Sequence, residues 1–157
     1  MPDSDALPDC LLCDPRRADA VFRRVRVWQD ELWRLSAVQQ GAIPGFAHLE
    51  PRRHIPFITD LDGPEAASLG AVLAEVTQVL RVAADAEKTY VYVFGDRVPH
   101  LHFNLAPHRA GDALRGGPGL QEPDAVPAEP ERLAAVAAAA QAALRGFRSG
   151  VGLGSAG

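Results

Sequence analysis

The stretch from Thr89 to Asp112 constrains the fold more than any other part of the chain. Two β-rich runs flank a turn built on Gly95 and Pro99. The second run alternates strictly, and a period of two is typical of a half-buried strand. Its apolar positions, which we expect to pack into the core, are Leu101, Phe103 and Leu105. Its polar positions share the opposite face and are His100, His102 and Asn104.

The rest of the pattern predicts an α+β fold, with an antiparallel sheet of about five strands, one long helix and a C-terminal helix. The expected strands are 22–28, 32–38, 46–51, 89–94 and 101–105, and the first two form a hairpin. A helical apolar stripe predicts the long helix over 62–84, with Asp62 as N-cap and Glu65 as its capping-box partner.

An alanine-rich segment from Glu131 to Arg145 predicts the C-terminal helix. Its small apolar side chains are compatible with a docked helix, a dimer contact or a frayed tail helix. Residues 1–9 are expected to be a flexible N-terminus, and the Gly- and Ser-rich residues 149–157 a disordered tail.

Composition excludes several classes of function. The net charge of −4 argues against general nucleic-acid binding. No apolar run reaches about 18 residues, so we expect no membrane span. No secretory signal is visible, so a reducing cytoplasm is the expected location. Cys10 and Cys13 are then metal ligands or a redox pair rather than a structural disulfide.

The Cys10-x-x-Cys13 motif by itself leaves three interpretations open. It is half of a zinc site, a thioredoxin-like redox pair, or two free thiols beside unrelated histidines. A tetrahedral Zn²⁺ accepts two thiolates and two neutral imidazoles, so the first interpretation requires two histidines from elsewhere in the chain.

Two motifs resemble the histidine-triad (HIT) family. His100-Leu101-His102-Phe103-Asn104 is similar to the family's His-x-His-x-His signature, with Asn104 in place of the third histidine. This variant is more similar to the uridylyltransferase and dinucleoside-polyphosphate phosphorylase branch, where a Gln occupies that position. A second motif, Gly-x-x-x-Leu-x-Pro-Lys/Arg-x-His, is matched by Gly45, Leu49, Pro51, Arg52 and His54.

The resemblance covers residues 10–112 and implies a HIT-like domain there, followed by a loop and helix over 113–148. It also implies a structural Zn²⁺, because related proteins hold zinc with the residues that correspond to Cys10, Cys13, His54 and His100. HIT proteins are commonly homodimers whose sheets join, so the resemblance implies a homodimer as well.

The resemblance further implies a nucleotide hydrolase or nucleotidyl transferase that acts at an α-phosphate. His102 is the expected nucleophile, and the His100 carbonyl is the expected acceptor for its Nδ1 proton. Asn104 is expected to donate to a phosphate oxygen, and Arg97 is either a phosphate ligand or a solvated turn residue. Candidate substrates are dinucleoside polyphosphates, nucleoside phosphoramidates and nucleoside diphosphate conjugates.

The alternative function is a catalytically weak nucleotide-binding or interaction protein that keeps the fold and the zinc site. Two further histidines, His48 and His108, lie outside the matched positions and are expected on the surface or behind the site. A possible basic rim for polyphosphate, if it is not simply solvated, consists of Arg52, Arg53 and Arg109.

Overall fold

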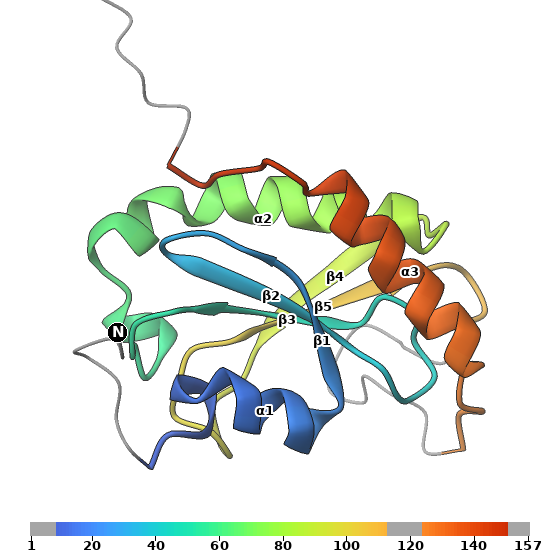
Figure 1. The fold of residues 1–157 in the computed structure, drawn as a ribbon, viewed down its shortest axis with the longest axis horizontal. Helices are drawn as coiled ribbons and strands as arrows, with labels where there is room; N and C mark the ends of the chain where they lie inside the picture. Colours follow the sequence, from blue (N-terminus) through green and yellow to red (C-terminus); the bar gives the residue numbers. More distant parts are fainter. Residues whose placement is uncertain (1–8, 113–123, 151–157) are drawn as a thin grey trace, which may run out of the picture.

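The computed structural model describes residues 9–112 and 124–150, and one five-stranded antiparallel sheet organises them (Figure 1). The strands are β1 (Arg24–Gln29), β2 (Trp33–Val38), β3 (Ala47–Pro51), β4 (Lys88–Val93) and β5 (Phe103–His108). They lie in the order β1-β2-β3-β5-β4. The helices are η1 (Leu11–Cys13), α1 (Pro15–Phe22), η2 (Ile58–Asp60), α2 (Gly63–Ala83) and α3 (Pro130–Ala143). The α+β prediction is confirmed, as are the hairpin of β1 with β2 and the long helix.

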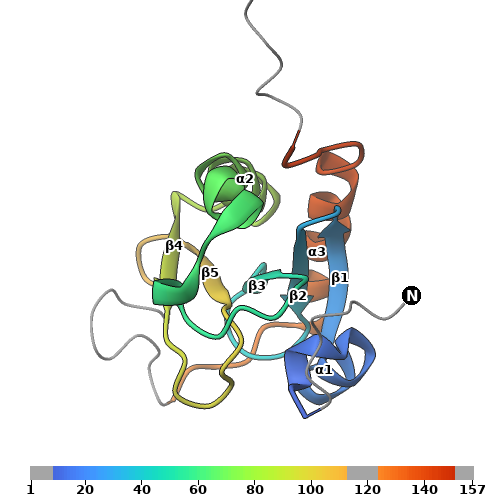
Figure 2. The ribbon, with the colours of Figure 1, turned by 90° about the vertical axis from the view of Figure 1, so that its left-hand side faces the viewer.

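The helices are divided between the two faces of the sheet (Figures 1 and 2). Helix α2 lies across one face with α3 beside it, and α1 lies on the opposite side near β1. The core fills the space between the sheet and the first two of these helices. Its fully buried members include Leu35, Leu49 and Leu105 from the sheet, Val72, Val76 and Leu80 from α2, and Val136, Ala140 and Leu144 from α3 and its end. The C-terminal helix is therefore docked.

Helix α2 is, by length and composition alone, long and apolar enough to cross a membrane. Core helices of other folds pass the same test, so this finding is weak. In this fold Val72, Val76 and Leu80 form a buried stripe against the sheet, which explains the apolar character of α2.

Helix α1 was not expected, and it shortens the first predicted strand. Asp14 is its N-cap, because a side-chain oxygen of Asp14 accepts from the backbone N–H of Arg17 at 3.1 Å. Pro15 occupies the first helical position, which favours helix initiation. The helix ends at Arg23, whose φ of 50° is left-handed, so β1 begins at Arg24 rather than at Phe22.

The last strand also begins later than predicted, at Phe103 rather than at Leu101. The backbone N–H of Leu101 donates to the carbonyl of Ile55 at 2.7 Å, outside the ladder. Strand β3 ends at Pro51, which has no N–H to offer, and its pairing with β5 stops at Leu49 opposite Phe103. His100 and His102 therefore lie on the segment leading into β5, not within the strand.

The predicted capping box at the start of α2 is not formed. The Asp62 side chain makes no cap hydrogen bond. Asp62 and Glu65 instead both pair with Arg53, and the Glu65 carboxylate lies 3.0 Å from its guanidinium. The Arg53 guanidinium thus binds the two carboxylates that a capping box would direct to backbone N–H groups.

The chain after α3 is anchored at the far end of the β1–β2 hairpin. The ring centroid of Phe147 lies 5.1 Å from that of Trp28, and the Phe147 carbonyl accepts from Trp28 Nε1 at 3.0 Å. The Ser149 N–H donates to the Asp30 carboxylate at 2.7 Å, so this first residue of the predicted tail is held. Residues 1–8, 113–123 and 151–157, which include most of the predicted N-terminus, loop and tail, lie outside the described residues.

The docking of α3 predicts unequal costs for two identical substitutions. Val136→Ala removes two methyl groups from a side chain that is 1% exposed, so we expect a loss of roughly 1–3 kcal/mol in unfolding free energy. Val82→Ala on α2 is the matched control, because Val82 is 62% exposed, and we expect a change within about 0.5 kcal/mol. Urea denaturation measures both, and equal losses would contradict the docked position of α3.

Candidate metal centre and active-site cleft

Four side chains from three separate segments form one cluster: Cys10, Cys13, His54 and His100. Their ligand atoms all lie within 4.8 Å of one another. The Cys10 sulfur lies 3.4 Å from His100 Nδ1, and the Cys13 sulfur lies 3.4 Å from His54 Nδ1 and 3.6 Å from His100 Nδ1. These are the four residues for which the sequence predicted a zinc site, and the structure brings them together.

The orientation of His100 is fixed from behind the cluster. Its Nε2 donates to the carbonyl of Pro51 at 2.9 Å, so Nδ1 is the bare nitrogen that faces the two sulfurs. A hydrogen bond of this kind on the far nitrogen is how metal-bound histidines are usually held. The His100 side chain is fully buried, and burial lowers its pKa, which favours the neutral imidazole that a metal requires.

The distances fit a tetrahedral ion. Zn–S bonds of about 2.3 Å and Zn–N bonds of about 2.0–2.1 Å at a tetrahedral angle separate sulfur from nitrogen by about 3.6 Å. The observed separations are 3.4–3.6 Å. Neither cysteine is in a disulfide, and the two sulfurs face imidazole nitrogens. The donor set and its spacing therefore fit Zn²⁺ better than they fit a thiol-redox pair.

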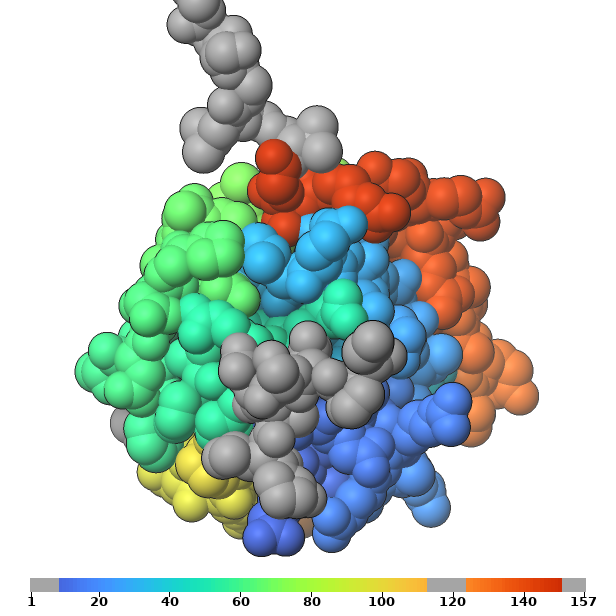
Figure 3. Space-filling model, turned by 60° about the vertical axis from the view of Figure 1, so that its left-hand side comes forward, coloured from blue at the N-terminus to red at the C-terminus, as the bar shows by residue number. Residues whose placement is uncertain are grey.

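The fold explains how distant segments converge on this cluster. Helix η1 presents the cysteines, the turn after β3 presents His54, and the segment entering β5 presents His100. Figure 3 shows the corresponding blue, teal and yellow segments on the same face of the molecule. A side-chain hydrogen bond to the backbone also holds η1: Arg34 Nη2 donates to the carbonyl of Leu12 at 2.9 Å.

A cleft of about 330 Å³ opens next to the metal cluster. Its lining residues come from η1, α1, β3, β5 and the β4–β5 connection, and they are Leu12, Phe22, His48, Phe94, Gly95, Asp96, Arg97, Val98, His102 and Asn104. His102 is half-buried, and its Nδ1 donates to the His100 carbonyl at 2.7 Å, as the resemblance implied. Nε2 is therefore the bare nitrogen of His102.

The other two predicted phosphate-binding residues differ in how free they are. Arg97 is exposed at the cleft wall, and the described part of the chain offers it no ion pair. Asn104 is only 8% exposed, and its Nδ2 donates to the backbone carbonyl of Tyr92 at 3.3 Å. Part of the amide's donor capacity is thus already used within the sheet.

His48 is a cleft residue that the sequence analysis placed on the surface or behind the site. It lies opposite Asn104 in the pairing of β3 with β5, and its ring centroid is 5.8 Å from that of His102. Burial and, after it, the neighbouring Arg24 guanidinium lower the pKa of His48 to about 4. The signal for this position was available in part, since His48 alternates with Leu49, which points into the core.

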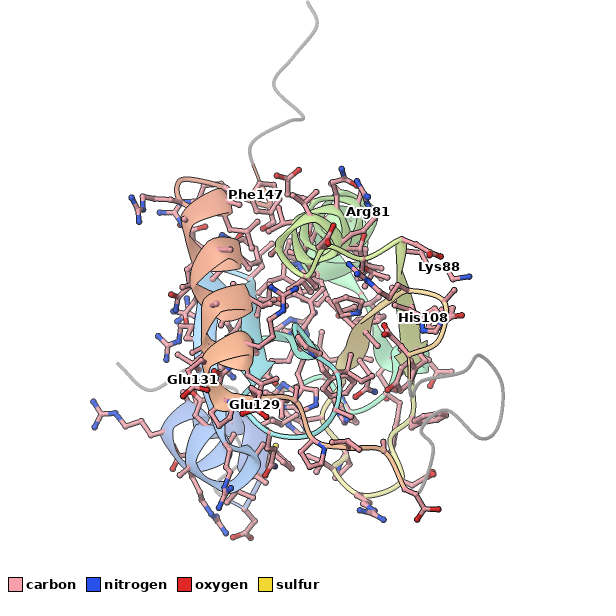
Figure 4. The ribbon with its side chains drawn as sticks, turned by 90° about the vertical axis from the view of Figure 1, so that its right-hand side faces the viewer. Arg81, Lys88, His108, Glu129, Glu131 and Phe147 are labelled. Atoms are coloured by element: carbon pink, nitrogen blue, oxygen red, sulfur yellow. The ribbon has the colours of Figure 1, made fainter. Side chains whose placement is uncertain are left out.

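The predicted basic rim is not formed. Arg53 pairs with Asp62 and Glu65, Arg109 with Asp85 at 2.8 Å, and Arg52 donates to the Asp30 carbonyl at 3.0 Å. None of the three lines the cleft. His108 lies near Lys88 at the opposite end of the β4–β5 pair (Figure 4), so it is outside the site, as expected.

Solved structures with the same architecture are histidine-triad proteins. One from Sinorhizobium meliloti is 23% identical with a TM-score of 0.65, covering 83% of this chain and 95% of that one. One from Bradyrhizobium japonicum is 24% identical with a TM-score of 0.63, covering 76% and 89%. A Zn-bound member from Mycobacterium smegmatis is 21% identical with a TM-score of 0.59, covering 84% and 93%.

Among curated proteins, the nitrilase and fragile histidine triad fusion protein NitFhit of Caenorhabditis elegans is 34% identical over 73 residues. That match covers 43% of this chain and 17% of the relative's length. No family model matches the chain.

The fold and site define an α+β protein with a Cys₂His₂ cluster beside a histidine-lined cleft. The protein has the histidine-triad (HIT-like) fold, with a His-x-His-x-Asn variant of the motif.

The geometry of the cluster predicts one zinc ion per chain. Elemental analysis of the purified protein is expected to give a 1:1 ratio, and Cys10→Ser is expected to lose the ion and roughly 5–10 °C in melting temperature. His108→Ala is the control, because His108 is remote from the cluster, and it should keep the full ratio. A folded, zinc-free wild type with two reactive thiols would instead support the redox interpretation.

Proposed function

We propose that the protein is a nucleotide hydrolase or nucleotidyl transferase that attacks an α-phosphate through His102. The observation that carries the proposal is the hydrogen bond from His102 Nδ1 to the His100 carbonyl, 2.7 Å long, at the wall of the cleft. It keeps the proton on Nδ1, so the Nε2 lone pair is available to phosphorus. The likeness to histidine-triad structures, one of them described as nucleotide-binding, supports the same class of substrate.

The proposed reaction has two displacements. The Nε2 lone pair of His102 forms a bond to the α-phosphorus, and the bond from that phosphorus to the leaving group breaks with its electron pair on the leaving group. A nucleotidyl-histidine results. Water, phosphate or another acceptor then forms a new bond to phosphorus, and the P–Nε2 bond breaks to restore His102. No carboxylate is needed to activate the nucleophile, because a neutral imidazole is already nucleophilic near pH 7.

Zinc held by Cys10, Cys13, His54 and His100 has a structural role in this proposal. Four protein ligands close a tetrahedral site and leave no position for substrate. These residues would hold the ion between η1 and the segment that carries His102, and the ion would thereby fix the position of the nucleophile. Thiolate ligands persist in a reducing compartment, which is consistent with the expected cytoplasmic location.

A catalytically weak nucleotide-binding protein is the second candidate, and Asn104 is the observation that favours it. The Asn104 side chain is one methylene shorter than the Gln of the related branch, and it already donates to the Tyr92 carbonyl. A site with a nucleophile but too few donors toward the phosphate would bind nucleotides and turn them over slowly.

Intact-protein mass spectrometry separates the two candidates. Wild type is mixed with dinucleoside polyphosphates, nucleoside phosphoramidates and nucleoside diphosphate sugars, and quenched briefly without acid. We expect a mass increase of one nucleotidyl group, which identifies the transferred nucleotide. His102→Ala should give none, and His108→Ala should behave as wild type because His108 is outside the cleft.

The other outcomes are equally informative. If folded, zinc-loaded protein gives neither adduct nor turnover, His102 is not a nucleophile. The nucleotide-binding protein is then the remaining candidate. If wild type turns over substrate without a detectable adduct, and His102→Ala abolishes that turnover, the enzyme proposal stands. The second displacement is then faster than the first.

We also propose a homodimer that pairs the β4 edges of two sheets. Strand β4 is an edge strand: helix α2 packs against it, and within the described residues no further strand pairs with its outer edge. The exposed apolar side chains on and next to β4 are Val91, which is 42% exposed, and Phe94, which is 59% exposed. An open edge with apolar side chains favours pairing with a second copy.

Sedimentation equilibrium tests the dimer. Wild type is expected at twice the 16.8 kDa of one chain. Val91→Lys places a charge on the edge of each copy, so it should shift the protein to monomer. Val126→Lys is the control, because Val126 is 82% exposed and remote in sequence from β4, and it should remain dimeric. A monomeric wild type at micromolar concentration would exclude the proposal.

A further inference from the structure

A buried group of charges lies beneath the cleft and has no role in the function proposed so far. Glu50 on β3 accepts from Arg24 Nη1 at 2.9 Å and from Arg34 Nε at 2.7 Å. Arg24 also pairs with Asp19 on α1, 2.9 Å away. The side chains of Arg24 and Glu50 are fully buried. Replacing such a cluster with apolar residues often increases stability, so its presence calls for a reason other than stability.

The cluster reaches the cleft through Arg24. Its Nη1, besides pairing with Glu50, lies 3.2 Å from Nδ1 of His48. A guanidinium has only donors, so Nδ1 of His48 must be the acceptor and carry no proton. The neutral ring then bears its hydrogen on Nε2. The low pKa of His48, which arises from burial and from Arg24, agrees with a ring that stays neutral at physiological pH.

The remaining nitrogen of His48 is open to the cleft. Its Nε2 has no hydrogen-bond partner among the described residues. This nitrogen is also not one of the fully buried polar atoms that lack a partner, so it is not sealed from the cleft. His48 lines the same cleft as His102 and Asn104. The Nε2–H group is therefore a donor held in the cleft with no acceptor among the described residues.

This donor adds to the exposed Arg97 guanidinium on the cleft wall. His48 lies directly opposite Asn104 across the β3–β5 pair, and Asn104 already donates to the Tyr92 carbonyl. A phosphate that His102 attacks would place negatively charged oxygens within this group of side chains, and charge-assisted hydrogen bonds to such oxygens are strong.

We propose that Arg24, anchored by Glu50, holds His48 as its neutral Nε2–H tautomer, and that this N–H donates to a phosphate oxygen of the nucleotide bound beside His102. His48 is then a phosphate-binding residue and Arg24 a positioning residue that acts through it. The inference rests on the proposed function for the identity of the ligand, whereas the tautomer is a property of the unliganded protein.

The first test measures the tautomer without any ligand. Nitrogen-15 NMR of the imidazole rings at neutral pH distinguishes a protonated Nε2 from a protonated Nδ1. We expect the Nε2–H form for His48 in wild type. Arg24→Lys keeps the buried charge for Glu50 but loses the planar fork that reaches both partners, so we expect mixed tautomers. An Nδ1–H form or an imidazolium for His48 in wild type would overturn the inference.

The second test measures the contribution of the donor to binding. Affinities are compared for the four common nucleoside 5′-monophosphates and the matching nucleosides. His48→Ala is expected to weaken monophosphate binding about 10- to 100-fold while nucleoside binding stays unchanged. His48→Gln, whose amide N–H can take the place of Nε2–H, should recover most of the loss. The control His108→Ala should change neither affinity.

The outcomes separate failure of this inference from failure of the proposed function. If wild type prefers monophosphates and His48→Ala keeps that preference in full, the inference is wrong and the proposed function stands. If wild type binds no monophosphate, both are wrong. If His48→Ala does not fold, His48→Phe replaces it, because Phe fills the space without a donor. Equal monophosphate affinities in wild type and His48→Phe would then overturn the inference.

Discussion

The arrangement of the site depends on how the single residue His100 uses three of its polar groups. Its Nε2 donates to the Pro51 carbonyl, its Nδ1 faces the two cysteine sulfurs, and its carbonyl accepts the proton of His102 Nδ1. The first bond sets which nitrogen faces the metal cluster, and the last sets which nitrogen of His102 is bare. The geometry of the Cys₂His₂ cluster and the orientation of the His102 ring are therefore two consequences of one buried imidazole and its own peptide group.

Glu50 organises the space beneath this residue by holding two arginines that extend in different directions. Arg34 reaches the Leu12 carbonyl of the metal-binding segment, and Arg24 reaches His48 in the cleft. Burial alone raises the pKa of Glu50, but the two guanidinium groups outweigh burial and lower it. Loss of Glu50 would leave two arginines buried without their anion, at a cost of roughly 3–5 kcal/mol. Charge in this core thus fixes positions that apolar packing would leave free.

Much of the fold and site could be predicted because periodicity and spacing carry them. Alternation identified the strands, and the resemblance of three motifs to those of histidine-triad proteins identified Cys10, Cys13, His54 and His100 as the metal cluster. Local rules failed where the outcome depends on a partner distant in sequence. The start of β5 depends on Ile55, which takes the Leu101 N–H, and the missing capping box depends on Arg53, which takes Asp62 and Glu65. His48 was misplaced because its environment is set by Arg24, a residue 24 positions earlier.

The position of His48 also bears on why Asn104 is compatible with a working cleft. In a row of side chains across β3, β5 and β4, the groups His48, Asn104 and Tyr92 are neighbours in register. Asn104 is short and bonds sideways to the β4 backbone, so it stabilises the row rather than reaching outward. His48 extends further from its strand, and Arg24 directs its hydrogen-bearing nitrogen away from the core. In the proposed phosphate site, a histidine on the next strand therefore provides a donor where the third motif histidine is substituted.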